Sequence, residues 1–128
     1  MKRSFLLAKV HRAFVTEANV AYEGSLTLDR DLMDAAGFRE YERIDVWNVT
    51  NGHRFSTYLI NGPRGGGDCC INGAAAHLCT PGDRVIIATF CELEPAEIET
   101  HHPQVVLVKG PTNREFTVKT EETAFTPH

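Results

Sequence analysis

The sequence predicts a mainly β protein, a small β-barrel that carries only short helices. Three observations predict this fold class: several short runs of strand-forming residues, little helical periodicity, and turn signals at frequent intervals. The length of 128 residues fits a single domain, residues 1–128, around one hydrophobic core. Apolar residues make up 42% of the chain and charged residues 23%, a balance typical of globular proteins and not of disordered ones.

The first strand is expected at residues 5–15. Its alternating positions do not separate into a polar and an apolar face. Lys9 and His11 therefore lie either on a solvated edge strand or on the wall of a pocket.

Two local signals place further elements. Asp29 is a suitable helix N-cap and Gly37 a suitable C-terminal stop, with apolar residues spaced for one face between them. Asn51-Gly52 lies between two β-rich runs and predicts a hairpin with a type I′ turn, which needs positive φ at both positions.

The other elements follow from alternation and turn residues. In chain order we expect a turn at 16–19, strands at 20–28, 44–50 and 54–60, a glycine-rich loop at 63–68, a strand at 69–71, a turn at 80–83, a buried strand at 84–93, a helical turn at 95–100, a connector at 101–103, a strand at 104–109 and a loosely held, flexible tail at 111–128.

Charge and hydropathy narrow the classes of partner. The net charge of −4 argues against a nucleic-acid partner, because phosphate binding favours a basic surface. No apolar run reaches the roughly 18 residues that a membrane span needs, and the apolar run near the N-terminus is too short for a signal peptide. We therefore expect a cytoplasmic protein with no membrane and no nucleic-acid partner.

The four cysteines are expected to be reduced thiols. Cys69 and Cys70 are neighbours whose side chains diverge on a strand, and neither Cys79 nor Cys91 completes a C-x-x-C spacing. His77 alone does not make a zinc site, so we expect no metal.

The pair Gly24-Ser25 has a chemical possibility that an ordinary turn lacks. The Ser25 hydroxyl can attack the Gly24 carbonyl and move the acyl group from nitrogen to oxygen. The resulting ester can eliminate to dehydroalanine, which hydrolyses to a pyruvoyl group at a new chain start. Glycine suits this step because it tolerates conformations closed to other residues. The alternative is a polar turn between two strands.

Several blocks along the chain carry a family resemblance, and they lie in the family's order over about residues 5–91. They are Lys9-Val10-His11-Arg12, Tyr22-Glu23-Gly24-Ser25, Asp45-Val46-Trp47-Asn48-Val49-Thr50-Asn51-Gly52, Arg54-Phe55-Ser56-Thr57-Tyr58, Asn72-Gly73-Ala74-Ala75-Ala76-His77 and Gly82-Asp83 with the strand after it. With these blocks the chain resembles the aspartate 1-decarboxylases, the pyruvoyl enzymes that make β-alanine for pantothenate and coenzyme A. The triglycine 65–67, Cys69-Cys70 and the segment after Gly110 depart from the family's pattern.

The resemblance implies a double-psi β-barrel and a homotetramer with active sites between neighbouring subunits. It also implies self-cleavage between Gly24 and Ser25 into a β chain, residues 1–24, and an α chain, residues 25–128. The covalent cofactor would then be a pyruvoyl group derived from Ser25, which accepts electrons when the bound L-aspartate loses CO₂. A maturation factor is a possible further partner.

The resemblance and the chemistry together nominate the site residues. Ser25 and Tyr58 are the expected catalytic residues, with Tyr58 as the proton donor. Gly24, Ser25 and Thr57 are expected to act in processing. Aspartate brings two carboxylates, for which Arg54 offers a bidentate fork and Lys9 a second cation. The other expected substrate-binding residues are Thr57, Asn72, Gly73, Ala74 and Ala75, and the lower-ranked pocket members are His11 and Tyr22.

Two questions stay open at this point. Thr57 and Tyr58 point to opposite faces of a regular strand, and alternation does not say which face is inside. Asn72 either caps a helical turn or orients the pyruvoyl group. The rival functions are decarboxylation of another acidic amino acid and a barrel that never cleaves and serves as a binding module.

Overall fold

The computed structural model of this protein describes residues 1–119. The elements are β1 (Arg3–Phe14), β2 (Glu17–Asn19), β3 (Ser25–Asp29), α1 (Arg30–Ala36), β4 (Arg43–Asn48), β5 (Arg54–Gly62), β6 (Cys69–Asn72), the 3-10 helix η1 (Gly73–Leu78), β7 (Arg84–Leu93), α2 (Pro95–Ile98), β8 (Gln104–Val108) and β9 (Phe116–Lys119).

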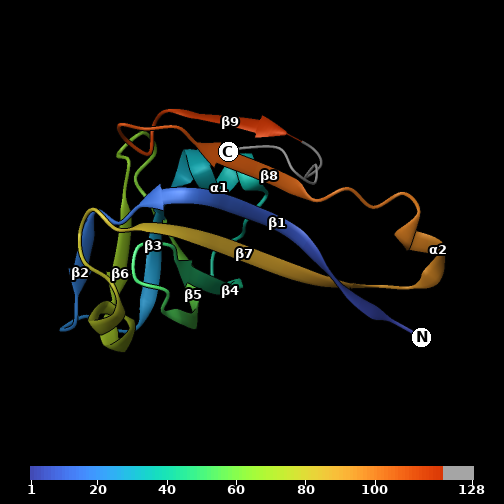
Figure 1. The fold of residues 1–128 in the computed structure, drawn as a ribbon, viewed down its shortest axis with the longest axis horizontal. Coiled ribbons are helices and arrows are strands. Elements are labelled where there is room, and N and C mark those ends of the chain that lie inside the picture. The colour runs from blue at the N-terminus through green and yellow to red at the C-terminus, as the bar shows by residue number, and fades with distance from the viewer. Residues whose placement is uncertain (120–128) are drawn as a thin grey trace.

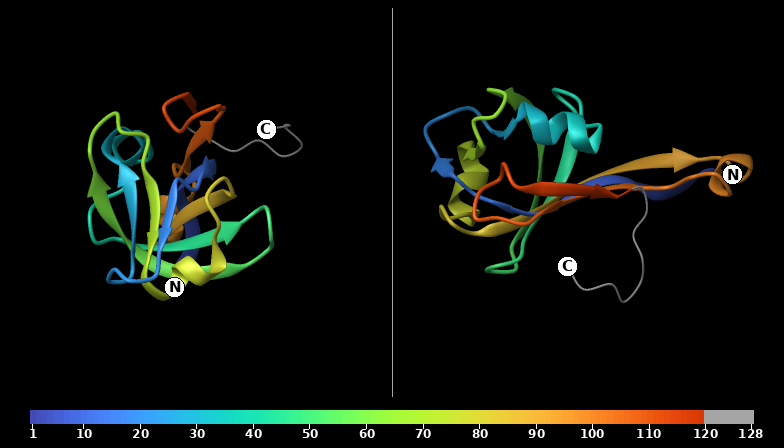
Figure 2. Two further views of the ribbon diagram at one scale, coloured as in Figure 1. Left: turned by 90° about the vertical axis from the view of Figure 1, so that its left-hand side faces the viewer. Right: turned by 90° about the horizontal axis from the view of Figure 1, so that it is seen from above.

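The strands form one sheet whose order is β2-β6-β3-β5-β4-β7-β1-β8-β9. Most neighbours are antiparallel, but β3 with β5, β1 with β8, and β2 with β6 run parallel. The sheet curls around a shared interior, as the left view of Figure 2 shows, and hydrogen bonds do not close it. Strands β1 and β7 continue side by side into an arm that ends near α2 (Figure 1). The mainly β, barrel-like prediction with short helices is confirmed.

The core lies where the curled strands and α1 face one another. Its largest fully buried side chains are aliphatic or thioether groups, whose burial stabilises the fold by about 1.5–3 kcal/mol each. They are Leu26, Leu28, Leu32, Met33, Ile44, Leu59, Ile71, Ile87, Val10, Val46, Val85 and Val105.

Strand β1 departs from the alternation expected at 5–15. Its pairing with β7 shifts register between Leu6 and Ala8 and again between Val10 and Ala13. Such irregularities insert a residue and turn the following side chains to the other face. As a result Lys9 is buried, with 8% of its surface exposed, between buried neighbours on both sides. Arg12 takes a positive φ of 67°.

The expectation for residues 16–28 is wrong in its order of turn and strand. Residues 17–19 form β2, which pairs with β6, and residues 20–24 form the turn before β3. Strand β2 exists because β6, from far along the chain, supplies its hydrogen-bond partners. A local reading of the sequence does not contain that partner.

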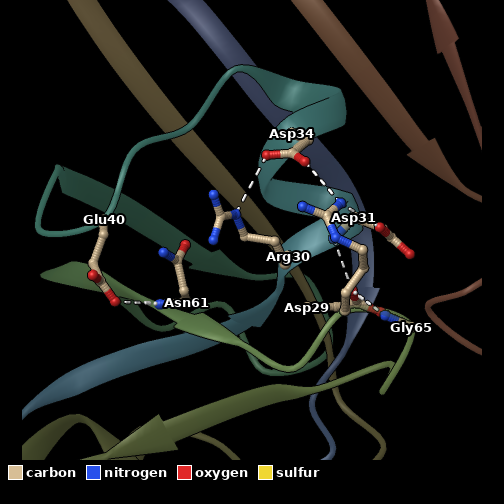
Figure 3. A network of polar contacts seen from close by, with 8 residues as sticks. Asp29, Arg30, Asp31, Asp34, Glu40, Asn61 and Gly65 are labelled. Carbon is tan, nitrogen blue, oxygen red and sulfur yellow. Dashed lines mark hydrogen bonds and ion pairs between the residues drawn. The ribbon is translucent and has the colours of Figure 1, made fainter.

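Helix α1 begins and ends where the sequence predicts. The Asp29 carboxylate accepts the Asp31 N–H at 2.8 Å, and Gly37 ends the helix in the left-handed conformation, with φ 73°. Asp29 also accepts the N–H groups of Gly65 at 3.0 Å and Gly67 at 2.8 Å. One buried carboxylate therefore caps α1 and holds the glycine-rich loop against the end of β3 (Figure 3).

The outer side of α1 carries an exposed ion-pair network. The Arg64 guanidinium lies 2.8 Å from both Asp31 and Asp34. Its hydrogen bond holds the pKa of Asp34 below its usual value. Exposed pairs of this kind contribute little to stability.

The hairpin is confirmed, but its turn is not the expected one. Strands β4 and β5 pair with Trp47 opposite Arg54, so the loop between them spans residues 49–53. Within this loop only Gly52 has a positive φ, at 82°. A type I′ turn at Asn51-Gly52 needs a positive φ at both residues and is therefore excluded. Hydrogen bonds from Gly52 N and Asn48 N, both 2.8 Å, close this longer loop.

The segment after Gly110 is not a tail over its whole length. Asn113 is buried and bonds Phe14 at both backbone groups and the Gly67 carbonyl. Residues 116–119 form β9 on β8. The expectation of a loose tail is therefore wrong for residues 111–119, and residues 120–128 lie outside the described part of the chain.

Two further sequence expectations bear on the environment of the protein. All four cysteines are free thiols. Among residues 1–119 no helix has the length and apolarity that a membrane crossing requires.

Cys79 gives a testable pH dependence of stability. Burial raises the pKa of its thiol from 9.0 to about 11. The unfolded chain therefore loses this proton at lower pH than the folded protein, so the free energy of unfolding should fall as pH rises from 9.0 towards 11. Urea unfolding under reducing conditions should show a shallower fall for Cys79→Ala than for wild type. An equal fall with pH in wild type and Cys79→Ala would contradict the assignment of this pH dependence to Cys79.

Candidate functional site

Ser25 lies at the first position of β3, where its hydroxyl is almost fully enclosed. Its exposed fraction is 6%, and its partner across the antiparallel pair with β6 is Asn72. The Asn72 Nδ2 donates to Ser25 Oγ at 3.1 Å and reaches Thr27 Oγ1 at 3.4 Å. The structure thus brings together the two residues nominated for processing and pyruvoyl orientation.

Asn72 answers one of the open questions. It holds the N-cap position of η1, yet its side chain makes no capping hydrogen bond. The side-chain amide donates to Ser25 Oγ instead. The Asn72 side chain therefore bonds Ser25 and does not cap η1.

The residues on either side of Ser25 and Asn72 complete this corner. Gly24 and Tyr22 belong to the exposed turn before β3, and 65% of the Tyr22 surface is exposed. Gly73 is buried, whereas Ala74 is exposed and Ala75 is half-buried, all at the start of η1. Small residues here leave the backbone of η1 accessible beside the Gly24-Ser25 bond.

Strand β5 presents its nominated residues on two faces, as its alternation predicts. Arg54 and Tyr58 are exposed, and Thr57 between them is half-buried on the inner side. Tyr58 precedes Leu59, the parallel partner of Leu26, so it lies beside Ser25 in the register of β3 and β5. Two adjacent strands therefore carry Ser25, Tyr58 and Thr57, and the phenol and the threonine hydroxyl lie on different faces of β5.

Arg54 is positioned by a residue that the sequence analysis did not nominate. Its guanidinium carbon lies 5.1 Å from the centroid of the Trp47 ring. This cation–π contact holds the fork on the exposed face of the β4–β5 pair. Arg43 is a second cation on that face, directly opposite Tyr58. The hairpin signal and, for Trp47, a block of the family resemblance were the clues to these residues, and neither specifies the cross-strand partners.

A buried amide ties this hairpin to η1. Asn48 is 2% exposed and donates to the Leu78 carbonyl at 3.1 Å and to Asp83 Oδ2 at 2.9 Å. Asn51 donates to the same Leu78 carbonyl at 3.0 Å. These bonds fix the C-terminal end of η1 relative to the β4–β5 hairpin, whose second strand begins with Arg54.

Lys9 and His11 occupy a different part of the sheet. Both are on β1, which is separated from β3 by β5, β4 and β7 in the strand order. His11 lines a small cavity of about 120 Å³ with Arg12, Arg84 and Lys109. The structure of one chain therefore does not place Lys9 and His11 in the strand group that holds Ser25.

A cavity larger than the one lined by His11 lies away from this site. It measures about 460 Å³ and lies beside the polar network of α1, between Arg30, Arg39 and Asn61. Figure 3 shows Arg30 and Asn61 pointing into this region. The Ser25 corner instead combines an enclosed hydroxyl and an amide donor with the Tyr58 phenol on the adjacent strand, and Arg54 adds a guanidinium further along β5. Such a set can rearrange a peptide bond, bind a carboxylate and supply a proton.

Comparisons with known proteins identify the family of the chain. The family model described as aspartate decarboxylase matches residues 1–115. An aspartate 1-decarboxylase of Syntrophobacter fumaroxidans is 56% identical over 110 residues, which cover 86% of this chain and 89% of that protein. The enzyme of the same name from Myxococcus xanthus is 54% identical, covering 84% and 83%, and that of Ralstonia nicotianae is 50% identical, covering 89% and 94%. The chain belongs to the aspartate decarboxylase family.

Proposed function

We propose that this protein converts L-aspartate to β-alanine and CO₂ after cutting its own chain between Gly24 and Ser25. The observation that carries the proposal is the hydrogen bond from Asn72 Nδ2 to the enclosed Ser25 Oγ, at 3.1 Å. It holds a hydroxyl next to the one bond whose rearrangement yields a pyruvoyl group.

In the processing step, Ser25 Oγ attacks the Gly24 carbonyl carbon. The new C–O bond replaces the C–N bond, and the hydroxyl proton passes to the nitrogen. Elimination then releases residues 1–24 with a terminal carboxylate and leaves dehydroalanine at residue 25. Water hydrolyses the dehydroalanine to the pyruvoyl ketone, and its nitrogen leaves as ammonia. Thr57, half-buried on the neighbouring strand, supplies a hydroxyl for the Gly24 carbonyl as it becomes tetrahedral.

The surroundings of Ser25 fit the group that replaces it. In that group the ketone oxygen takes the place of the Ser25 nitrogen and Oγ leaves with residues 1–24, so the Asn72 N–H that bonded Oγ lies beside the new chain start without that partner. The pyruvoyl group supplies the electron-accepting carbonyl for decarboxylation. Asn72 can then donate to the ketone oxygen, and the low exposure of residue 25 limits access of water to it.

Arg54 anchors one carboxylate of the substrate. Its planar fork suits a carboxylate, and stacking on Trp47 restrains it before substrate binds. The small residues Gly73, Ala74 and Ala75 let the substrate approach the backbone of η1. Tyr58, beside Ser25 and on the same face as Arg54, donates the proton that the product carbon needs.

The distribution of these residues supports a homotetramer with active sites between subunits. Arg54, Tyr58 and Tyr22 are exposed in the single chain, and Lys9 lies on a distant strand. A neighbouring subunit would cover the exposed face and bring Lys9 to the substrate as the second cation, with His11 beside it. Free cysteines support a cytoplasmic location, and a maturation factor is a further partner in this proposal.

Ser25→Ala should remain one uncut chain without activity, because it removes the attacking oxygen. Intact-mass spectrometry should find the wild type broken between residues 24 and 25, with the longer chain lacking its terminal amine. Ser4→Ala, at an exposed position of β1, should process like wild type. Production of β-alanine by uncut Ser25→Ala would defeat the proposal.

Tyr58→Phe should still be cut but should turn over about 100-fold or more slowly, because the proton donor is missing. The measurement is kcat per pyruvoyl group, counted by mass spectrometry. Tyr41→Phe removes another exposed phenol and should leave kcat unchanged, because Tyr41 bonds β5 through its backbone N–H, which the change keeps. Wild-type turnover by Tyr58→Phe would remove this residue as the proton donor.

Arg54→Ala should raise KM for aspartate roughly 10- to 150-fold, since a charged hydrogen bond contributes about 1.5–3 kcal/mol. Arg54→Lys should recover only part of this loss, because lysine keeps the charge without the fork. Arg3→Ala, near the N-terminus of β1, is the matched control. An unchanged KM in Arg54→Ala would show that the anchor lies elsewhere.

A further inference from the structure

The backbones of residues 24 and 73 approach each other unusually closely. The pairing of Ser25 with Asn72 places Gly24 and Gly73 at the next opposed positions. A Cβ added to Gly73 would lie 2.6 Å from Gly24 Cα and 2.7 Å from Gly24 N. It would also lie 3.2 Å from the Tyr22 carbonyl oxygen. All three are backbone atoms, so any side chain at position 73 would have to displace the segment that contains the bond to be cut.

The steric restriction is one-sided. A Cβ added to Gly24 would meet nothing within 4 Å. Gly73 also has a φ of 73°, a conformation that favours glycine. The contact therefore depends on the absence of a side chain at position 73, on the strand opposite the bond.

Gly73 and its neighbour Asn72 hold the two sides of the same peptide bond. Asn72 holds the attacking Ser25 Oγ through its side chain, and Gly73 supports Gly24 through its backbone. An attack needs both the oxygen and the carbonyl carbon in place, and a displacement of about 1 Å can cost about 100-fold in rate. A shift of the Gly24 backbone away from Gly73 would move the carbonyl while Asn72 kept the hydroxyl where it is.

We propose that Gly73 is a positioning residue for self-cleavage. Its missing side chain lets residues 22–24 lie against the start of η1, which holds the Gly24 carbonyl within reach of Ser25 Oγ. This role rests on the proposed function and precedes any contact of Gly73 with substrate. It acts on the first step, in which the C–O bond forms, the C–N bond breaks and the hydroxyl proton moves to the nitrogen.

The test follows cleavage of freshly purified full-length Gly73→Ala by intact-mass spectrometry over time. We expect cleavage at least 10-fold slower than in wild type. The matched control is Gly82→Ala, because Gly82 has a φ of 95° but a Cβ there would meet nothing within 4 Å. It carries the backbone strain of a glycine replacement without the collision and should cleave like wild type. Equal cleavage rates for Gly73→Ala and wild type would overturn the proposal.

Hydroxylamine identifies the step that is slowed. It splits an ester between residues 24 and 25 but leaves an amide whole. Uncut Gly73→Ala should resist hydroxylamine, because the carbonyl is out of reach and no ester forms. Splitting at that bond would show that the ester does form and would overturn a role in the first step.

Folding is checked in the uncleavable Ser25→Ala background. There, Gly73→Ala and Gly82→Ala should unfold at similar temperatures. If only Gly73→Ala failed to fold, the glycine would serve the fold and the positioning role would be rejected. If wild type and Gly82→Ala also stayed uncut, the proposed function itself would fail, which separates the two outcomes.

Discussion

The contact between the start of β3 and the end of β6 is the constraint on which the site depends. Ser25 faces Asn72, and Gly24 lies against Gly73, so the chain around residue 24 is held from one side by hydrogen bonding and by close backbone packing. The hydroxyl is buried at the same point where the preceding turn becomes exposed. A reactive side chain and a bond free to rearrange therefore lie next to each other.

The far end of β3 is held just as firmly. Asp29 accepts N–H groups from α1 and from the glycine-rich loop, and that loop in turn accepts hydrogen bonds from Asn113 and Arg114. The strand that begins at Ser25 is thus anchored at its C-terminal end by α1 and the glycine-rich loop, and residues 113–114 hold that loop in turn.

The exposed face of the β4–β5 pair has the opposite character. Arg54 rests on Trp47, and Arg43 lies opposite Tyr58, but solvent reaches this face in the single chain. Two cations and a phenol share this open surface, and a guanidinium can form paired hydrogen bonds with a carboxylate. Burial by another copy of the chain would strengthen these charges, since removal of water lowers the local dielectric.

Local chemistry in the sequence determined several features by itself. These features are the Asp29 cap, the Gly37 stop, the Asn51-Gly52 hairpin and the pairing of a glycine with a serine. Each depends on residues a few positions apart, because its physical cause acts over that range. The resemblance to the family came from blocks of the same kind. The nominated residues on β3, β5 and β6 are brought together in the structure, whereas Lys9 and His11 are not.

Tertiary structure alone decided the rest. The irregular pairing of β1 buries Lys9, β2 exists only because β6 lies beside it, and Trp47 meets Arg54 through a loop longer than the turn signal indicates. The approach of Gly73 to Gly24 joins residues 49 positions apart, and nothing near either glycine encodes it. Each of these features depends on which distant segment supplies the hydrogen bonds and fills the space, and short-range sequence patterns carry no record of that partner.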